Sequence, residues 1–155
     1  MQIRVPFMPQ APSRLGVARR LLAVPLMVGT TGLVAELLLI GHIDTWWQRV
    51  PLVLLVAALA VVALHVVRPR RAIRRLLQAV MLACLASGTI GIGLHYSANE
   101  REVLIADPRV DGWERVARSA RGTMPALAPG SMSLLGLVGL IYGWAAAEEE
   151  RLAGA

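Results

Sequence analysis

Four long runs of apolar residues divide the chain, and the segments between them carry most of its polar residues. The runs cover residues 21–42, 50–67, 76–95 and 127–147. A helix needs about 20 mostly apolar residues to cross the hydrocarbon core of a bilayer. The pattern therefore predicts an all-α, polytopic membrane protein whose transmembrane domain, residues 21–147, is a four-helix bundle.

The composition supports this prediction. Of the 155 residues, 56% are hydrophobic and 17% are charged, whereas a soluble domain carries about 25% charged residues. The first run is too long for the apolar core of a signal peptide and contains Glu36, so we expect a retained helix. Cys84 lies within the third run and is predicted to be a small core residue without a disulfide partner.

Arginine supplies all of the excess positive charge, because the chain has no lysine and a net charge of +6. The arginines cluster before the first run and between the second and third runs, at Arg14, Arg19, Arg20, Arg68, Arg70, Arg71, Arg74 and Arg75. By the positive-inside rule, both termini are predicted to be cytoplasmic in a bacterial inner membrane. Arginines at the ends of apolar runs do not form a stripe on a soluble fold, so no nucleic-acid partner is expected.

The two tails differ in character. Residues 1–20 form a predicted cytoplasmic tail in which Pro6, Pro9 and Pro12 follow the three-residue repeat of polyproline II. Such a tail can dock in an extended form on a protein partner, and the alternative is a disordered leader. Residues 148–155 are predicted to form a short acidic cytoplasmic tail.

The outer link between the third and fourth helices, residues 96–124, is the largest predicted soluble segment. Its first half holds a short apolar run, residues 103–106, bounded by turn signals. Its second half places apolar residues at helical spacing, with arginines on the other side: Trp113, Val116, Ala117, Ala120 and Met124 against Arg115, Arg118 and Arg121. This pattern predicts a short amphipathic helix, either on the outer membrane face or packed on the bundle.

Small residues recur on one side of three predicted helices. Helices in lipid associate mainly through close packing of such residues and through polar contacts. The predicted helix-packing and polar-core positions are Gly29, Gly32, Glu36, Ser87, Gly91, Gly139 and Gly143. These faces form either the bundle interior or a contact with another membrane subunit.

Glu36 is the only carboxylate deep within a predicted span. An ionised carboxylate at the bilayer centre costs at least about 2.5 kcal/mol, and removal from water favours its neutral form. We expect Glu36 to face protein, on the side of Gly29 and Gly32. It then serves either as a structural hydrogen-bonding group, as a proton or cation relay, or as a contact for a quinone or pigment.

Two histidines, His42 and His95, fall at the outer ends of their helices, and Glu100 and Glu102 follow the second. These four residues are the candidate metal or haem ligands. The pattern is weak, because no two histidines have the i, i+4 spacing that places both on one helical face. We assign no metal, and terminal histidines also serve as interface anchors. The sequence requires no cofactor and leaves contact with a pigment, haem or quinone open.

Signatures of catalysis are missing from the sequence. It has no G-x-S-x-G motif and no phosphate-binding glycine loop. The runs "AELLLIGHIDTWWQRVPLVLL", "GLHYSANERE" and "PALAPGSM" resemble a group of small, uncharacterised four-span bacterial membrane proteins. This resemblance covers most of the chain and implies no activity, cofactor or site.

The sequence therefore predicts a non-catalytic structural or accessory subunit of a larger membrane complex, with photosynthetic or respiratory complexes as candidate hosts. Lipid and other membrane subunits are its expected partners. The alternative is a proton- or ion-translocating or redox-linked protein that uses Glu36, with His42 and His95 near the outer mouth of the bundle.

Overall fold

The computed structural model describes residues 14–124 and 128–154, and these are helical with no strand among them. The helices are α1 (Arg14–Leu39), α2 (Trp46–Val67), α3 (Arg71–Ala106), α4 (Gly112–Ala120) and α5 (Ala128–Ala153). The proline-spaced part of the N-terminal tail lies outside the described residues, and so does residue 127, the predicted start of the fourth span.

Helices α1, α2, α3 and α5 are each long and apolar enough to cross a bilayer. The prediction of an all-α protein with four membrane-spanning helices is thereby confirmed, as is a short amphipathic helix between the third and fourth spans. By length and composition these helices indicate a membrane protein whose apolar surface contacts lipid.

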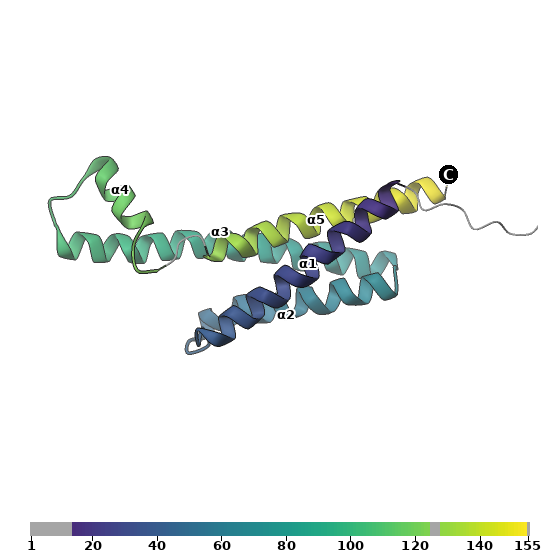
Figure 1. Ribbon diagram of the computed structural model, residues 1–155, viewed down its shortest axis with the longest axis horizontal. Coiled ribbons are helices and arrows are strands. Elements are labelled where there is room, and N and C mark those ends of the chain that lie inside the picture. Colours follow the sequence, from purple (N-terminus) through teal and green to yellow (C-terminus); the bar gives the residue numbers. More distant parts are fainter. Residues whose placement is uncertain (1–13, 125–127, 155) are drawn as a thin grey trace, which may run out of the picture.

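The four long helices form an up-and-down bundle. Helix α1 packs on α2 and α5, α2 packs on α3, and α3 runs along α5 over the longest contact (Figure 1). The buried core includes Leu26, Leu55, Leu77, Met81 and Tyr142, so each long helix contributes to it. We call the end where α1 begins and α2 ends the arginine end, after Arg14, Arg20, Arg68 and Arg70.

A tight turn joins α1 to α2 at the opposite end. Gly41 has a φ of 65°, and its N–H donates to Leu38 while the His42 N–H donates to Leu37 at 2.9 Å. This is the Schellman arrangement, which needs a left-handed residue and therefore favours glycine. Thr45 and Gln48 then form a capping box, so α2 begins four residues before the predicted residue 50.

Helix α3 is much longer than predicted. Its 36 residues span about 54 Å at a rise of about 1.5 Å per residue, whereas the hydrocarbon core is about 30 Å thick. Residues 96–106, expected in a link, are its continuation, and the apolar run 103–106 forms its last turn. Figure 1 shows this part of α3, with α4, projecting beyond the other helices.

Helix α4 packs on the projecting part of α3. Asn99, which is buried, donates from Nδ2 to the Met124 carbonyl at 2.8 Å and accepts from the Met124 N–H at 3.0 Å. Arg115 pairs with Glu100 at 2.9 Å. Trp113 is 80% exposed, so α4 meets α3 through polar groups and leaves part of its apolar stripe uncovered.

Glycines bring the backbones of α3 and α5 into close contact. A Cβ atom on Gly136 would lie 2.6 Å from the backbone nitrogen of Leu85 and 2.7 Å from the carbonyl oxygen of Met81. One on Gly88 would lie 2.6 Å from the backbone nitrogen of Ser133. Because backbone atoms cannot move aside as a side chain can, these two positions admit only glycine at this helix separation.

We predict that Gly136→Ala lowers the free energy of unfolding by about 1–3 kcal/mol, as overpacking does in other cores. Gly93→Ala is the matched control, because Gly93 lies in the same helix pair and has open space around it. The control is expected to be neutral or to stabilise by up to about 1 kcal/mol through helix propensity. Unfolding in mixed micelles, followed by circular dichroism, measures both, and equal effects would contradict the close contact.

Candidate functional site: a polar clamp at the arginine end

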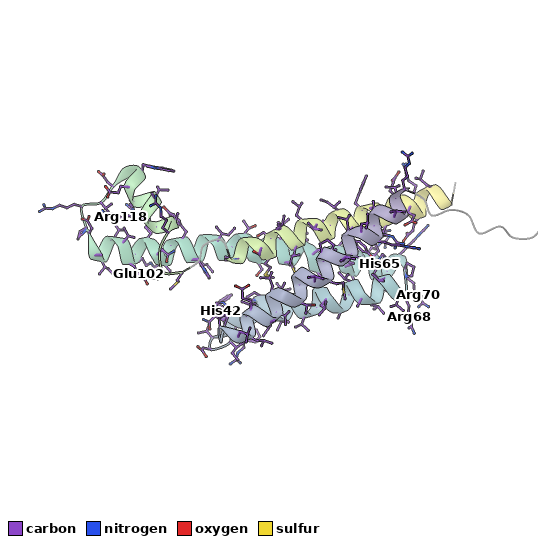
Figure 2. All side chains as sticks on the ribbon, viewed as in Figure 1. His42, His65, Arg68, Arg70, Glu102 and Arg118 are labelled. Carbon is purple, nitrogen blue, oxygen red and sulfur yellow. The ribbon has the colours of Figure 1, made fainter. Side chains whose placement is uncertain are left out.

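Polar side chains from all four long helices meet inside the arginine end of the bundle. We call this group the polar clamp; its members are Arg19 on α1, His65 on α2, Arg74 on α3, and Tyr142, Glu149 and Glu150 on α5. Figure 2 shows His65 at this end, near Arg68 and Arg70 of the α2–α3 turn. The clamp combines one buried hydrogen bond with ion pairs.

His65 and Tyr142 form the buried part of the polar clamp. Their exposed fractions are 0% and 1%, and His65 Nδ1 lies 2.9 Å from the Tyr142 hydroxyl oxygen. The rings meet edge to face at 5.4 Å, a favourable aromatic geometry. When the imidazole proton is on Nε2, the tyrosine hydroxyl donates to Nδ1, and this bond connects α2 to α5.

The second ring nitrogen of His65, Nε2, is buried and has no hydrogen-bond partner among the described residues. A buried polar group without a partner costs about 1–3 kcal/mol. Sequence spacing explains why His65 is inside: it follows the buried Ala58, Val61 and Val62 at helical intervals. The core accepts one polar side chain here because Tyr142 pairs with it.

Ion pairs surround this hydrogen bond. Arg19 Nε lies 3.0 Å from a Glu149 carboxylate oxygen, which connects α1 to α5. Arg74 Nε lies 3.5 Å from Glu150, which connects α3 to α5. Together with His65, these contacts connect the last turns of α5 to each of the other three spans.

The acidic tail prediction is therefore corrected. Glu148, Glu149 and Glu150 belong to α5, which continues to Ala153, and two of them pair with arginines of the bundle. The sequence held a signal for this: Glu149 lies seven residues after Tyr142, which places both on one helical face. The prediction missed it because a run of three acidic residues near a chain end resembles a solvated tail.

The polar clamp lines neither of two grooves on the described surface. One, of about 420 Å³, lies between α1 and α2, and the other, of about 150 Å³, lies beside Trp46. Because its members pair with one another across helices, the clamp can hold the helices together.

No family model, curated protein or solved structure matches this chain.

Glu36 does not face the interior of this bundle, which was one of the two settings predicted for its side of α1. Its side chain is exposed on α1, and a Cβ atom on Gly32, one turn earlier, would meet nothing within 4 Å. Helix α1 crosses α5 at Gly29, where an added Cβ would lie 2.9 Å from Leu135. Beyond that crossing α1 and α5 diverge (Figure 1), so Gly32 and Glu36 have no helix opposite them in the described part of the chain.

The other predicted packing positions lie on α3 and α5. Added Cβ atoms would lie 2.8 Å from Pro129 at Gly91 and 2.9 Å from Gln78 at Gly143, and one at Gly139 would overlap the Met81 side chain. Ser87 is half-buried on α3. The three glycines lie along the seam that Gly88 and Gly136 also form.

The structure brings together two of the four candidate ligands. His42, in the α1–α2 turn, and His95, on α3, have ring centroids 6.4 Å apart, and we call the end of the bundle where they meet the histidine end. Glu100 instead pairs with Arg115, and Glu102 accepts a hydrogen bond from Thr123 at 2.8 Å. No group of three or more potential metal-ligating side chains occurs among the described residues, so the four-residue ligand set is not assembled.

Acidification should destabilise the histidine end. Partial burial, and then the neighbouring His95, lower the pKa of His42, and Asp44 opposes them. The unfolded chain therefore binds this proton more readily, and the stabilisation present above about pH 6.5 is lost as the pH falls through that value. Unfolding measured between pH 8 and pH 5 should show this loss, and His42→Gln should flatten the profile. An unchanged profile in the variant would contradict the assignment.

Loss of the buried hydroxyl should weaken the polar clamp. We expect Tyr142→Phe to lower the free energy of unfolding by about 1–3 kcal/mol, because it leaves His65 Nδ1 buried without a partner. Tyr96→Phe is the control, since Tyr96 makes no hydrogen bond from its hydroxyl among the described residues. Combining Tyr142→Phe with His65→Leu should cost less than the sum of the two changes. Additive costs would show that the pair is not coupled.

Proposed function

We propose that this protein is a non-catalytic structural or accessory subunit of a larger bacterial membrane assembly. The observation that carries the proposal is the exposure of Glu36 on the outside of α1. Intramembrane carboxylates almost always face protein or a water-filled cavity, since exposure at the bilayer centre costs at least about 2.5 kcal/mol. A partner helix that covers Glu36 and donates a hydrogen bond to it would remove this cost.

The surface around Glu36 suits a second helix. Gly32, Ala35, Glu36 and Leu39 are exposed and lie on one side of α1, and we call them the α1 outer face. Small residues let helix backbones approach closely, and one polar group then forms an interhelical hydrogen bond. The divergence of α1 from α5 leaves this face open for a partner.

The polar clamp fits the same role. It connects the four spans at one end through contacts among its own members, and it lines neither of the two grooves. Such a bundle supplies a rigid scaffold that presents the α1 outer face. A relay that runs from Glu36 to the histidine end has less support, because the Glu36 side chain is exposed on the outside of α1.

We further propose an inner-membrane location with the arginine end in the cytoplasm. Arg14, Arg20, Arg68 and Arg70 flank the spans there and are exposed, as the positive-inside rule requires. Trp46 and Trp47 are exposed at the other end of α2, where an aromatic belt is expected. Photosynthetic and respiratory complexes are candidate hosts, because they use small helical subunits of this kind.

Gly32→Leu tests the proposal, with Gly93→Leu as its control. Both glycines lie within spans and have open space around them, so both variants should fold. After mild-detergent extraction at native expression, we expect the parent and Gly93→Leu to migrate in an assembly well above the chain mass of 16.7 kDa. Gly32→Leu should migrate as the single chain.

Two changes at Glu36 refine the test. Glu36→Gln keeps a hydrogen-bonding group and should retain the assembly, whereas Glu36→Leu should lose it. A parent chain that purifies as a clean monomer would refute the subunit role. Loss of a transport or redox activity in Glu36→Gln, with the assembly intact, would favour the relay instead.

A further inference from the structure

An apolar groove opens between α1 and α2 toward the outside of the bundle. It has a volume of about 420 Å³. Its walls include Val24, Met27 and Val28 on α1 and Ala63, Val66 and Val67 on α2. Val24 is 60% and Val67 is 75% exposed, so the groove is open to the surrounding lipid along its length.

The groove lies next to the arginine end. Arg20 precedes Val24 by one helical turn on the same face of α1, and Arg68 directly follows Val67 at the end of α2. Both arginines are exposed. Figure 2 shows Arg68 with Arg70 at this end of the molecule. The apolar groove therefore has a cationic mouth.

Arg20 and Arg68 differ from three of the nearby arginines in having no acidic partner among the described residues, and Arg14, Arg70 and Arg75 resemble them in this. Arg19, Arg71 and Arg74 pair with Glu149 or Glu150. Arg20 and Arg68 form no ion pair with any carboxylate of the described residues. The positive charge at the mouth of the groove is therefore available to an external anion.

We propose that this groove binds an anionic phospholipid. Its phosphate lies against Arg20 and Arg68, and one acyl chain follows Val24, Val28 and Val66 into the groove. A partner helix fits less well, because the lining on α1 runs from Ala23 to Val28, about 8 Å at a rise of about 1.5 Å per residue. A single flexible acyl chain can fill such a short groove, and arginines near the ends of membrane spans attract acidic headgroups.

The lipid site and the proposed subunit role are independent, because the groove residues are not those of the α1 outer face. The probes are dioleoyl phosphatidylglycerol and dioleoyl phosphatidylcholine, which differ only in the headgroup. Full-length protein in a neutral detergent is titrated with each lipid, and bound lipid is counted by native mass spectrometry. We expect the anionic lipid to bind at least about fivefold more tightly, the scale of one arginine near an acidic headgroup.

The double variant Arg20→Gln with Arg68→Gln should lower affinity for phosphatidylglycerol between about 5- and 30-fold, because each arginine contributes on that scale. The control is the double variant Arg101→Gln with Arg109→Gln. These two arginines are exposed, lie on the projecting part of α3 and in the turn after it, and form no ion pair with a described carboxylate. The control should bind as the parent does. Equal losses in the two double variants would overturn the proposal, as would equal affinity of the parent for both lipids.

A third variant separates the groove from its charged mouth. Val66→Trp fills the groove from an exposed position, and its fold can be verified by circular dichroism. It should lower binding of phosphatidylglycerol although every arginine remains. Unchanged binding would show a diffuse attraction to the arginine end and would overturn the groove as the site. A second polypeptide seated in the groove, detected by cross-linking from Val66→Cys, would overturn it as well.

Discussion

The backbone contact between α3 and α5 sets the geometry of the whole bundle. Lipid offers no hydrophobic drive for one helix to join another, so close approach has to supply the attraction. Gly88 and Gly136 permit that approach, since any side chain there would meet the opposite backbone. Six residues after Gly136, the same rigid helix delivers Tyr142 to His65, and its next two turns deliver Glu149 and Glu150 to their arginines.

The two ends of the molecule are consequently built in opposite ways. At the arginine end, one helix makes polar contacts to the other three, and the carboxylates of α5 are paired. Toward the histidine end, α1 leaves α5 after Gly29, and α3 continues alone with α4 beside it (Figure 1). Glu36 is exposed because of this divergence. It lies on the same side of α1 as Gly29, so it would contact α5 if the two helices stayed together.

Sequence patterns predicted the parts of this fold that depend on one segment at a time. Apolar run length fixes the four spans, and helical spacing fixes α4. The polar clamp depends on which helices meet, so the sequence alone does not pair His65 with Tyr142, and Glu149 was predicted to be part of a tail. Glu36 shows the same limit. Helical spacing places Glu36 on the same side of α1 as Gly29, but the angle between α1 and α5 decides how far α5 stays in contact with that side. The end of α3 was misjudged because "SANERE" is polar enough to resemble a loop, yet it contains no residue that stops a helix.

The polar clamp fastens α1 and α2 to α5 at the arginine end, whereas His42 lies in the turn at the far end of the α1–α2 hairpin. A rotation of this hairpin about the fastened end would displace the turn that carries His42 more than any other part of the hairpin. The spacing of His42 from His95, 6.4 Å between ring centroids, is thus the most sensitive gauge of the angle between the two halves of the bundle.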